Sequence, residues 1–521
     1  MPTHPCSLDK TALSHTRPEH DCLISYFHHY AANHSDRDAI LYGDERISWQ
    51  DFMAKADQIC QWISAQGLGL GDMVGVVMHN CPEMLYIFAA LIKSGCCAVP
   101  INLSVSDEAL TAMLKDAGVK LVFTTPDQEN RIPELPGVSH IPRTKLAEIL
   151  SAPQKNCFPV GRRQDTPMNI IYSSGTTGTP KGIVHTFEGR LTWAKLLIPA
   201  LKYNPAPRTL CAIGLYSNIS WVGILCTWLQ GGYLIIQKKF DAESCLKLIE
   251  QEKITNFSMV PIMLQRLMAV ENQDSYDLSS IKGIMSCGSP LPAPLKQQLM
   301  DRFPKGSIIE LYGLTEGVIT TQNPSDSDGR LASVGKALPT TDIALLTDNE
   351  HIIPTTTADI SGEIIAKGPI LMPGYLNKPD ATLDATWIDP QSGEKWFKTG
   401  DIGKFDAEGF LYIIDRKKDM ILSGGQNIYP QDIEAVFHQH PNISEVAVIA
   451  AASKTWGETP IAICVLHTPI EKNDLLDWVN ARVGRQQRIT DIHFKTELPR
   501  NPNGKILKRE LRNQFKGHIY D

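Results

Sequence analysis

Ser173-Ser174-Gly175-Thr176-Thr177-Gly178-Thr179-Pro180-Lys181-Gly182 is a run of small polar residues with one cation, and it directly follows the apolar segment Met168–Tyr172. An apolar run of this length with an abrupt polar end predicts a buried strand that opens into a loop. Bare backbone N–H groups, a row of hydroxyls and one ammonium group suit the oxyanions of a polyphosphate. The glycines allow close approach of the backbone, and Lys181 neutralises charge. The stretch therefore predicts a phosphate-binding loop at the end of a strand.

This loop has two other interpretations. A Walker A loop is excluded, because that pattern requires Gly-Lys followed by Ser or Thr, whereas Pro180 precedes Lys181 and Gly182 follows it. A plain glycine-rich surface turn explains the ten residues equally well when they stand alone. The partners that would distinguish a phosphate loop from a turn must come from elsewhere in the chain.

Length and composition limit the class of protein. A chain of 521 residues is longer than one ordinary hydrophobic core supports, so at least two domains are expected. The net charge of −7 argues against nucleic acid as the main partner. No stretch reaches the roughly 18 uninterrupted apolar residues of a membrane span, and the polar segment Met1–His20 is unlike a secretory signal. The 12 cysteines lack any Cys-x-x-Cys pair, which favours reduced thiols in a cytoplasmic protein.

Strand-like and helix-like segments alternate over most of the chain. The apolar runs Tyr233–Ile236 and Asn256–Val260, for example, flank the amphipathic stretch Asp241–Glu252. Such alternation predicts βαβ units and parallel sheets, and therefore an α/β fold. From Ala332 to Ile414 the pattern changes to short alternating strands with glycine turns, which indicates a β-rich subdomain.

The remaining segments complete the expected domain organisation. The chain after Asp415 predicts a small α+β module, and Pro126–Pro167, which is rich in proline and charge, predicts a surface linker. We expect an N-terminal arm over residues 1–20, a large N-terminal domain over 21–415 and a small C-terminal domain over 416–521.

Glu310-Leu311-Tyr312-Gly313-Leu314-Thr315-Glu316 stands at the end of a second predicted strand, where ligands of open α/β sheets bind. An aromatic ring can stack on adenine, a glycine allows close approach, and a hydroxyl can contact an α-phosphate. A carboxylate such as Glu316 can hold Mg²⁺. For an isolated match, the simpler interpretation of Tyr312 as a core residue and Glu316 as a solvated loop acid would be favoured. Their occurrence beside a phosphate loop favours a nucleotide site.

Five further short segments carry residue types suited to binding, and four of them have a simpler interpretation. These interpretations are a strand-to-helix turn for Cys287–Leu291, a common tripeptide for Thr399–Asp401, a solvated charge run for Asp415–Ile421 and a surface lysine for Lys505. The segments are Cys287-Gly288-Ser289-Pro290-Leu291, Thr399-Gly400-Asp401, Asp415-Arg416-Lys417-Lys418-Asp419-Met420-Ile421, Ser423-Gly424-Gly425-Gln426-Asn427 and Pro499-Arg500-Asn501-Pro502-Asn503-Gly504-Lys505-Ile506.

In this order, the segments resemble the motifs of the adenylate-forming superfamily, which includes acyl-CoA and aryl-CoA synthetases, luciferases and peptide-synthetase adenylation domains. The resemblance extends from about Asp21 to Arg512 and is strongest to acyl-CoA synthetases. It implies a large N-terminal domain followed by a small mobile C-terminal domain on a hinge. It also implies that the protein uses Mg²⁺ as a cofactor and ATP and coenzyme A as co-substrates.

The resemblance assigns roles to residues of this sequence. It implies that Lys505, Thr315 and Glu316 are catalytic, that Glu316 holds the metal, that Lys418 is the hinge pivot, and that Gly424 and Gly425 admit the pantetheine arm of coenzyme A. Among the residues implied to bind ATP or AMP, Gly288 and Ser289 would contact adenine, and Asp401 and Arg416 would contact the ribose. The full set is Ser173, Ser174, Gly175, Thr176, Thr177, Gly178, Lys181, Gly288, Ser289, Tyr312, Gly313, Thr315, Asp401, Arg416 and Lys505.

One segment departs from the family pattern. Many relatives carry Pro-x-x-His where this chain has Gly214-Leu215-Tyr216-Ser217-Asn218-Ile219-Ser220-Trp221. The segment usually borders the acyl pocket, so we expect Ser217, Asn218 and Trp221 to line it; an ordinary core position explains Trp221 equally well. His185 is expected to satisfy loop backbone rather than to take part in chemistry.

The expected function is that of an ATP-dependent carboxylic acid–CoA ligase, which forms an acyl-adenylate with release of pyrophosphate and then an acyl-CoA thioester with release of AMP. The alternative is a stand-alone adenylation enzyme that passes the acyl group to a carrier protein or an amine. No carrier segment follows Lys505, which favours coenzyme A. A non-catalytic acyl- or nucleotide-binding protein would be expected to lack Lys505 or Glu316. The expected partners are a fatty, aryl or other carboxylic acid, ATP and coenzyme A, with homodimer formation left open.

Overall fold

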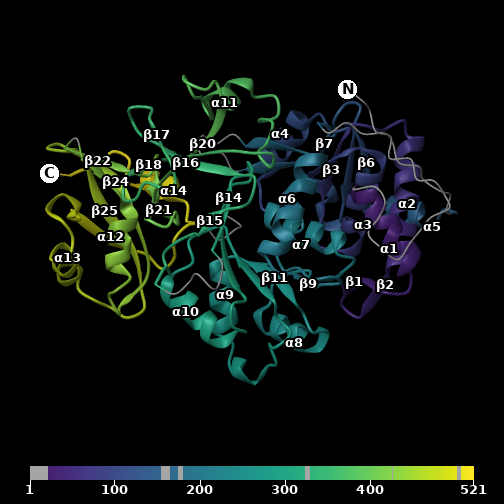
Figure 1. Ribbon diagram of the computed structural model, residues 1–521, viewed down its shortest axis with the longest axis horizontal. Coiled ribbons are helices and arrows are strands. Elements are labelled where there is room, and N and C mark those ends of the chain that lie inside the picture. Colours follow the sequence, from purple (N-terminus) through teal and green to yellow (C-terminus); the bar gives the residue numbers. More distant parts are fainter. Residues whose placement is uncertain are drawn as a thin grey trace. The chain divides into compact units, whose positions relative to one another are not determined.

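The computed structural model describes residues 22–153, 165–173, 180–322, 329–424, 426–500 and 506–520. The chain divides into two compact units (Figure 1). The first unit contains the chain up to Leu331 together with Ala337–Thr341 and Lys367–Trp387, and the second contains Ala332–Lys336, Asp342–Ala366 and Ile388–Asp521. The predicted boundary after residue 415 falls inside the second unit and stays a prediction, as does the N-terminal arm, which lies outside the described residues.

The first unit holds a long mixed sheet. Its inner strands are parallel, and an antiparallel strand closes each side of this series. In spatial order the strands are β14 (Ile319–Gln322), β13 (Ile308–Gly313), β12 (Gly283–Ser286), β11 (Asn256–Met259), β9 (Arg208–Cys211), β10 (Tyr233–Ile236), β1 (Asp38–Tyr42) and β2 (Glu45–Ser48).

A second sheet of the first unit carries the strand that leads into the phosphate loop. Its strands are parallel except for the last pair, which forms a hairpin. The order is β6 (Ser139–Ile141), β5 (Leu121–Thr124), β3 (Met73–Val77), β4 (Cys97–Pro100), β7 (Pro167–Ser173) and β8 (Lys181–Thr186). The predicted α/β fold is confirmed.

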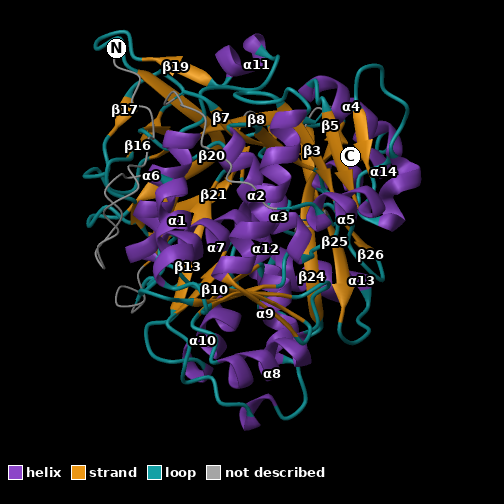
Figure 2. Ribbon diagram, turned by 90° about the vertical axis from the view of Figure 1, so that its right-hand side faces the viewer, coloured by secondary structure: helices purple, strands orange, loops and turns teal. Residues whose placement is uncertain are grey.

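Helices connect these strands and build the core. Ser48 caps α2, because its side-chain oxygen accepts from the Asp51 N–H at 3.0 Å. Helix α7 is buried from Ser220 to Leu229, as expected for a helix that is apolar on every side. Figure 2 shows α2 and α3 side by side. The helices are α1 (Leu23–Asn33), α2 (Trp49–Ala65), α3 (Pro82–Ser94), α4 (Asp107–Ala117), α5 (Arg143–Ser151), α6 (Phe187–Ala200), α7 (Asn218–Leu229), α8 (Ala242–Glu252), α9 (Pro261–Met268), α10 (Ala293–Arg302) and α11 (Pro379–Asp384).

The prediction of a surface linker over Pro126–Pro167 is wrong for much of that segment. A 3₁₀ turn (Pro126–Arg131), strand β6 and helix α5 occupy it, and β6 pairs in parallel with β5. Leu146 and Ile149 of α5 are buried in the main core. The apolar residues of α5 are few, so packing against α2 rather than local periodicity stabilises this helix.

The second unit is built around an antiparallel sheet and a mixed sheet. One has the order β17 (Ile352–Ile353), β16 (Asp342–Leu346), β18 (Ser361–Lys367), β20 (Lys395–Phe405) and β21 (Leu411–Arg416). The other contains β23 (Gln426–Ile428), β22 (Ile421–Ser423), β25 (Gly457–Leu466), β24 (Ile443–Ser453) and β27 (Ile519–Tyr520), with β26 (Asp491–Phe494) paired to β25. The helices of this unit are α12 (Pro430–Phe437), α13 (Lys472–Asn480) and α14 (Lys508–Gln514). Strands β15 (Lys336–Ala337) and β19 (Thr386–Ile388) lie where the chain passes between the units.

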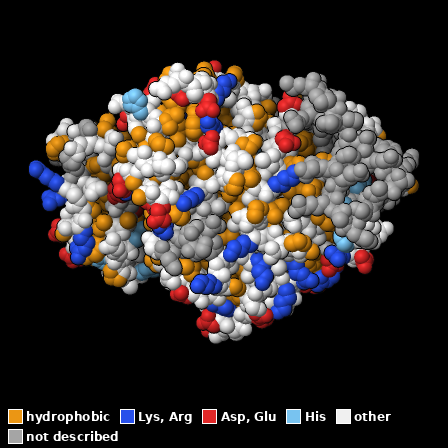
Figure 3. Space-filling model, viewed as in Figure 1, with side chains coloured by type: hydrophobic (Ala, Val, Ile, Leu, Met, Phe, Trp, Pro, Cys, Tyr) orange, Lys and Arg blue, Asp and Glu red, His pale blue; other side chains and the backbone are white. Residues whose placement is uncertain are grey.

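The surface and the thiols complete the description. Figure 3 shows acidic, basic and apolar side chains interspersed on one face, with Lys and Arg gathered along its lower part. Among the described helices, none has the length and apolar character needed to cross a membrane. The described cysteines are buried except for Cys22, which is partly buried.

Candidate active site

The predicted phosphate loop closes the β7–β8 hairpin. Ser173, the last residue of β7, pairs with Lys181, the first residue of β8. This antiparallel pairing fixes the two ends of the loop opposite each other at the edge of the sheet. Ser174, Gly175, Thr176, Thr177 and Gly178 lie outside the described residues, so their predicted roles stay predictions.

The Tyr312–Glu316 motif runs out of β13 into a tight turn before β14. The Leu314 N–H donates to the Val318 carbonyl at 3.0 Å, and the Gly317 N–H donates to the Leu314 carbonyl at 3.0 Å. Gly317 has φ +111°, and a Cβ at this position would lie 2.1 Å from the Ile370 carbonyl oxygen. Only glycine fits such a close approach of backbone. The turn therefore presents Thr315 and Glu316 in a fixed position.

Tyr375, which the sequence analysis did not single out, links this turn to the phosphate-loop hairpin. Its hydroxyl donates to Glu316 Oε1 at 2.9 Å, and Lys181 Nζ lies 4.8 Å from the centre of its ring. Burial, followed by the adjacent Glu316 carboxylate, raises the pKa of Tyr375. Tyr375 therefore stays protonated and donates to Glu316 across the physiological pH range. Its only sequence signal is an aromatic residue after Gly374.

The residues present suit a magnesium ion that is bound mainly by substrate phosphates. Mg²⁺ in nucleotide sites usually takes one or two carboxylates and fills its remaining positions with phosphate oxygens and water. Glu316, the predicted metal ligand, has a carboxylate of this type, and the Tyr375 hydroxyl donates to it. Within the described part of the chain, no cluster of three or more His, Cys, Asp or Glu side chains forms a complete metal cage.

The turn after β12 carries the predicted adenine contacts Gly288 and Ser289. Gly288 has φ +91°, which favours glycine, and its backbone approaches Val260 and Ile219 of neighbouring elements. The Leu291 N–H at the end of this turn donates to Glu310 Oε1 at 3.1 Å. A carboxylate at the start of the Glu310–Glu316 motif thus holds the adjacent turn in place.

Glu310 is itself part of a buried polar network. Its Oε2 accepts from Lys296 Nζ at 3.0 Å, and Lys296 also donates to the Leu331 carbonyl at 3.1 Å and to Gln322. Burial raises the pKa of Glu310, and the Lys296 ammonium opposes that rise. The network joins β12, β13, β14 and α10, and the sequence analysis did not single out Lys296.

The segment expected to border the acyl pocket forms the start of α7. Ser217 caps the helix, since its side chain accepts from the Ile219 N–H at 3.3 Å. Asn218 Oδ1 accepts from an Arg190 guanidinium nitrogen at 2.7 Å. Trp221 is fully buried, with its ring 4.7 Å from that of Phe88. Their role as the acyl pocket stays a prediction.

Two predicted ribose contacts lie together in the second unit. Asp401 on β20 pairs with Arg416 on β21, where Arg416 Nε lies 3.0 Å from Asp401 Oδ1. The Asp401 N–H donates to the Thr399 hydroxyl at 3.0 Å, and that hydroxyl donates to the Ile364 carbonyl at 2.8 Å. Asp401 is 3 % exposed. The geometry suits a carboxylate that is oriented to accept from a pair of hydroxyls.

The segment predicted as the hinge follows directly. Lys418 is exposed in the turn between β21 and β22. Asp415 beside it is buried and accepts from the backbone N–H groups of Arg416 at 2.6 Å and Gln431 at 3.1 Å. Burial raises the pKa of Asp415 to about 6, against the opposing effect of Lys508.

The residues predicted for the second half-reaction are described only in part. Gly424 has φ +57°, and a Cβ there would lie 2.8 Å from the Trp456 ring, so this position requires glycine. Its N–H donates to the Trp456 carbonyl at 2.9 Å. Gly425 and Lys505 lie outside the described residues.

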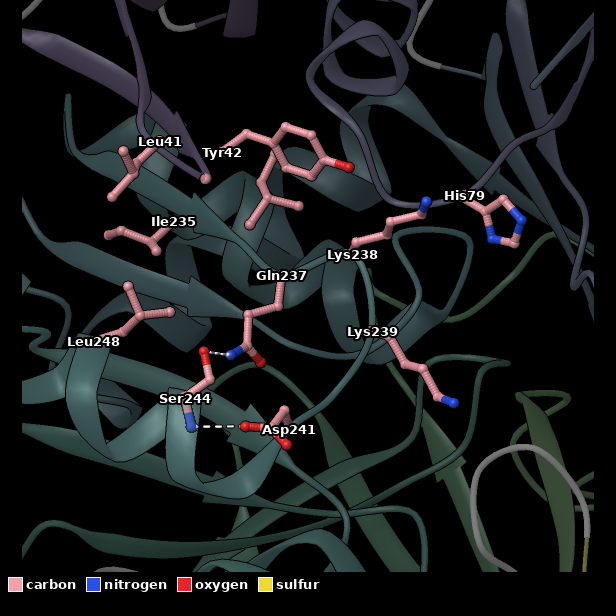
Figure 4. A pocket seen from close by; sticks show the side chains of 12 residues that line it. Leu41, Tyr42, His79, Ile235, Gln237, Lys238, Lys239, Asp241, Ser244 and Leu248 are labelled. Atoms are coloured by element: carbon pink, nitrogen blue, oxygen red, sulfur yellow. Dashed lines mark hydrogen bonds between the residues drawn. The ribbon is translucent and has the colours of Figure 1, made fainter. Parts of the chain in front are cut away.

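A spacious cavity of about 850 Å³ lies apart from these residues. It opens beside the ends of β1 and β10, and Figure 4 shows Lys238 and Lys239 extending from the segment after β10, with His79 nearby. Gln237 donates to the Ser244 hydroxyl at 3.1 Å on its wall. None of the residues predicted for the site lines this cavity, so its size alone does not identify it as the reaction centre.

The fold and the arrangement of these residues define a nucleotide-binding α/β enzyme with a separate C-terminal module. The chain belongs to the AMP-binding, adenylate-forming enzyme family: the family's model for the AMP-binding enzyme matches residues 27–376, and that for the AMP-binding enzyme C-terminal domain matches residues 432–505. The resemblance inferred from the motifs is confirmed.

Named relatives are similar over nearly the full chain. A 2-succinylbenzoate–CoA ligase of Bacillus subtilis is 30 % identical, with 93 % of this chain and 96 % of that protein covered. The long-chain-fatty-acid–CoA ligase FadD13 of Mycobacterium tuberculosis is 31 % identical, with 91 % of this chain and 94 % of that protein covered.

Solved structures are similar over the same extent. B. subtilis o-succinylbenzoate CoA synthetase (MenE) in complex with its acyl-adenylate intermediate has a TM-score of 0.83 at 29 % identity, with 95 % of this chain and 98 % of that chain covered. ATP-bound MatB from Rhodopseudomonas palustris has a TM-score of 0.85 at 25 % identity, with 94 % of this chain and 98 % of that chain covered.

The Tyr375 hydroxyl provides a direct test of the site. Tyr375→Phe removes the hydrogen bond to Glu316 and keeps the ring beside Lys181. Because partners that orient a metal ligand typically contribute about tenfold or more to metal affinity, we expect the Mg²⁺ concentration for half-maximal pyrophosphate–ATP exchange to rise about tenfold. Tyr412→Phe, which loses a tyrosine–carboxylate contact to Asp406 in the second unit, is the matched control. An unchanged Mg²⁺ dependence in Tyr375→Phe would show that this hydroxyl does not orient a metal ligand.

Asp415 gives a pH-dependence of stability with a defined sign. Its folded-state pKa of about 6 lies above the usual carboxyl value, so the folded chain binds more protons than the unfolded chain between about pH 4 and pH 6. The contribution of Asp415 is therefore complete below this window and is lost as the pH rises through it. A shift of about two units corresponds to about 3 kcal/mol.

Asp415→Asn removes this titration. We expect the free energy of unfolding of the variant, relative to the wild type, to increase from pH 4 to pH 7 by up to about 3 kcal/mol. Urea titrations at the two pH values measure this double difference, with the exposed Asp348→Asn as control. If the free energy of unfolding changed with pH equally in Asp415→Asn and the wild type, the raised pKa of Asp415 would be contradicted.

Proposed function

We propose that this protein is an ATP-dependent carboxylic acid–CoA ligase that forms AMP. The observation that carries the proposal is the link Lys181–Tyr375–Glu316, which joins a phosphate-loop hairpin to the turn that bears Thr315 and Glu316. The near full-length similarity to acid–CoA ligases supports the same reaction class.

In the first step, a carboxylate oxygen of the acid attacks the α-phosphorus of ATP. The bond from that phosphorus to the oxygen bridging the α- and β-phosphates breaks, and pyrophosphate leaves. The loop from Ser173 to Gly182 binds the β- and γ-phosphates, and Lys505 contacts the reacting carboxylate and α-phosphate. Mg²⁺, held by Glu316, supplies neutralisation of phosphate charge. Asp401 accepts from the ribose hydroxyls, and Gly288, Ser289 and Tyr312 contact adenine.

In the second step, the thiolate of coenzyme A attacks the acyl carbonyl carbon and AMP leaves. We propose that the C-terminal domain turns about Lys418 between the steps, so that Lys505 withdraws and Gly424–Gly425 admits the pantetheine arm. Such a rotation lets one site serve two reactions in sequence. A cytoplasmic location, where ATP and coenzyme A are both available, is part of the proposal.

Pyrophosphate–ATP exchange across a panel of carboxylic acids tests the reaction. We expect exchange that depends on the acid, and thioester formation when coenzyme A is added. Exchange without thioester would favour a carrier protein or an amine as acceptor. Absence of exchange with every acid would overturn the assignment as an adenylate-forming catalyst.

Lys505→Ala separates the two half-reactions. The lysine is expected to stabilise charge that spreads over the carboxylate and α-phosphate during adenylation, a contribution that reaches about a hundredfold or more for a well-placed charge. We expect at least that loss in pyrophosphate exchange, while thioester formation from supplied acyl-adenylate stays within about threefold of wild type. The exposed Lys516→Ala is the control. Equal loss, or equal survival, of both half-reactions would show that Lys505 is misassigned.

A further inference from the structure

Arg190 is a buried cation whose partners are neutral. The residue lies on α6 and is 2 % exposed. Its Nε donates to Asn169 Oδ1 at 3.0 Å, and a terminal nitrogen donates to Asn218 Oδ1 at 2.7 Å. The guanidinium carbon lies 4.6 Å from the centre of the Trp193 ring. Among the residues that the structure describes, no carboxylate pairs with it.

Such an arrangement is unfavourable without a further partner. A buried charge normally forms an ion pair, because the loss of hydration is only partly offset by neutral hydrogen-bond acceptors. Burial lowers the pKa of Arg190 to about 9, so the side chain is still charged at neutral pH. A guanidinium also has more N–H donors than the two that amide oxygens accept here. The site therefore has unused capacity for an anion.

Arg190 lines a small recess beside the Thr315–Glu316 turn. The other lining residues include His185, Trp193, Thr315, Gly317 and Ile370. The free volume is about 10 Å³, which is about the space of one water-sized oxygen. This space is suited to a single polar atom and excludes an alkyl chain.

His185 adds a second unsatisfied polar group to the recess. It is 6 % exposed, and its Nε2 has no hydrogen-bond partner within the described ranges of the chain. Burial, and then the adjacent Arg190 charge, holds the pKa of His185 well below its ordinary value, so the ring is neutral. A neutral imidazole offers one N–H donor. The recess thus combines a charged donor and a neutral imidazole beside space for one polar atom.

We propose that Arg190, with His185 beside it, recognises a second acidic group of the substrate, so that the enzyme activates a dicarboxylic acid through one carboxylate while one oxygen of the other occupies this recess. The inference rests on the proposed function and specifies its substrate class. Asn218, at the start of the predicted acyl segment, fixes the guanidinium, and Thr315 connects the recess with the turn of the reaction site. An acid with only an apolar tail would leave the buried cation without an anion. The recess therefore favours diacids over fatty acids.

The test compares each diacid with its own monomethyl ester in pyrophosphate–ATP exchange. The probes are short aliphatic and aromatic dicarboxylic acids, and the ester removes one charge with little change in size. A charge-assisted hydrogen bond in a desolvated site corresponds to about tenfold to a hundredfold in kcat/KM. We expect a preference of this size for at least one diacid over its ester.

Arg190→Met and Arg190→Lys test the residue itself. Arg190→Met should abolish the preference, and Arg190→Lys should keep its direction with a smaller ratio, because lysine retains the charge without the planar geometry. The exposed Arg266→Met should leave the preference unchanged. Because Arg190→Met also leaves the Asn169 and Asn218 oxygens without their donor, we expect a lower melting temperature whatever the role of Arg190, so the diacid-to-ester ratio of the folded variant decides between the roles. A purely structural role predicts an unchanged preference.

The outcomes separate this inference from the proposed function. Exchange that is equal for diacids and esters, and equal in wild type and Arg190→Met, would overturn the inference and leave the ligase assignment intact. Exchange with simple monocarboxylic acids alone would have the same meaning. Absence of exchange with all acids would overturn the ligase assignment, and the inference with it.

Discussion

The hydrogen bond from the Tyr375 hydroxyl to Glu316 is the contact on which the candidate site depends. The phosphate-loop hairpin and the Thr315–Glu316 turn are more than 100 residues apart in the sequence and belong to different sheets. Tyr375 touches both, because its ring lies beside Lys181 while its hydroxyl reaches the carboxylate. Backbone pairing between Ile183 and Tyr375 holds the residue against β8. The Lys181 ammonium group and the Glu316 carboxylate are thereby kept at a fixed separation.

Buried polar groups around this contact show how the fold supports the site. Glu310 and Lys296 form a hydrogen-bonded pair that fastens the turn after β12 to β13, and the pair is satisfied by further backbone and amide partners. Arg190 differs, since its partners are neutral amides. Satisfied buried networks specify a structure, whereas an unsatisfied buried charge is expected where a ligand supplies the missing partner. This difference distinguishes a supporting network from a candidate binding group.

The predicted site residues are divided between the two units. The phosphate-loop hairpin, the turn bearing Gly288 and the Thr315–Glu316 turn belong to the first, whereas Asp401, Arg416 and the predicted hinge belong to the second. Within the second unit, pairing of β20 with β21 brings Asp401 and Arg416 together. Such a division suits an enzyme whose two half-reactions need different groups in turn, because separate rigid units can be exchanged without distortion of either.

Local signals in the sequence were sufficient for the main elements. Helices α3 and α4 begin with Pro or after a Ser cap and end before glycines, so their bounds follow from the sequence alone. The strand leading to Ser173 and the turn bearing Gly317 likewise carry their own signals. Strand β6 and helix α5 were not predicted, because β6 is only three residues long and α5 carries few apolar residues. Strand β6 forms because it pairs with β5, and helix α5 forms because it packs on α2.

The sequence by itself determined the α/β class, the order of the motifs and the family. These depend on residue types at short spacing, where periodicity and turn chemistry act. Only the tertiary structure decided that Tyr375 joins Lys181 to Glu316, that Lys296 pairs with Glu310, and that Arg190 is buried against neutral amide partners. Each of these facts concerns side chains that are distant in the sequence or depends on the complete surroundings of a side chain. Burial and charge pairing are properties of the packed chain, and no local pattern contains them.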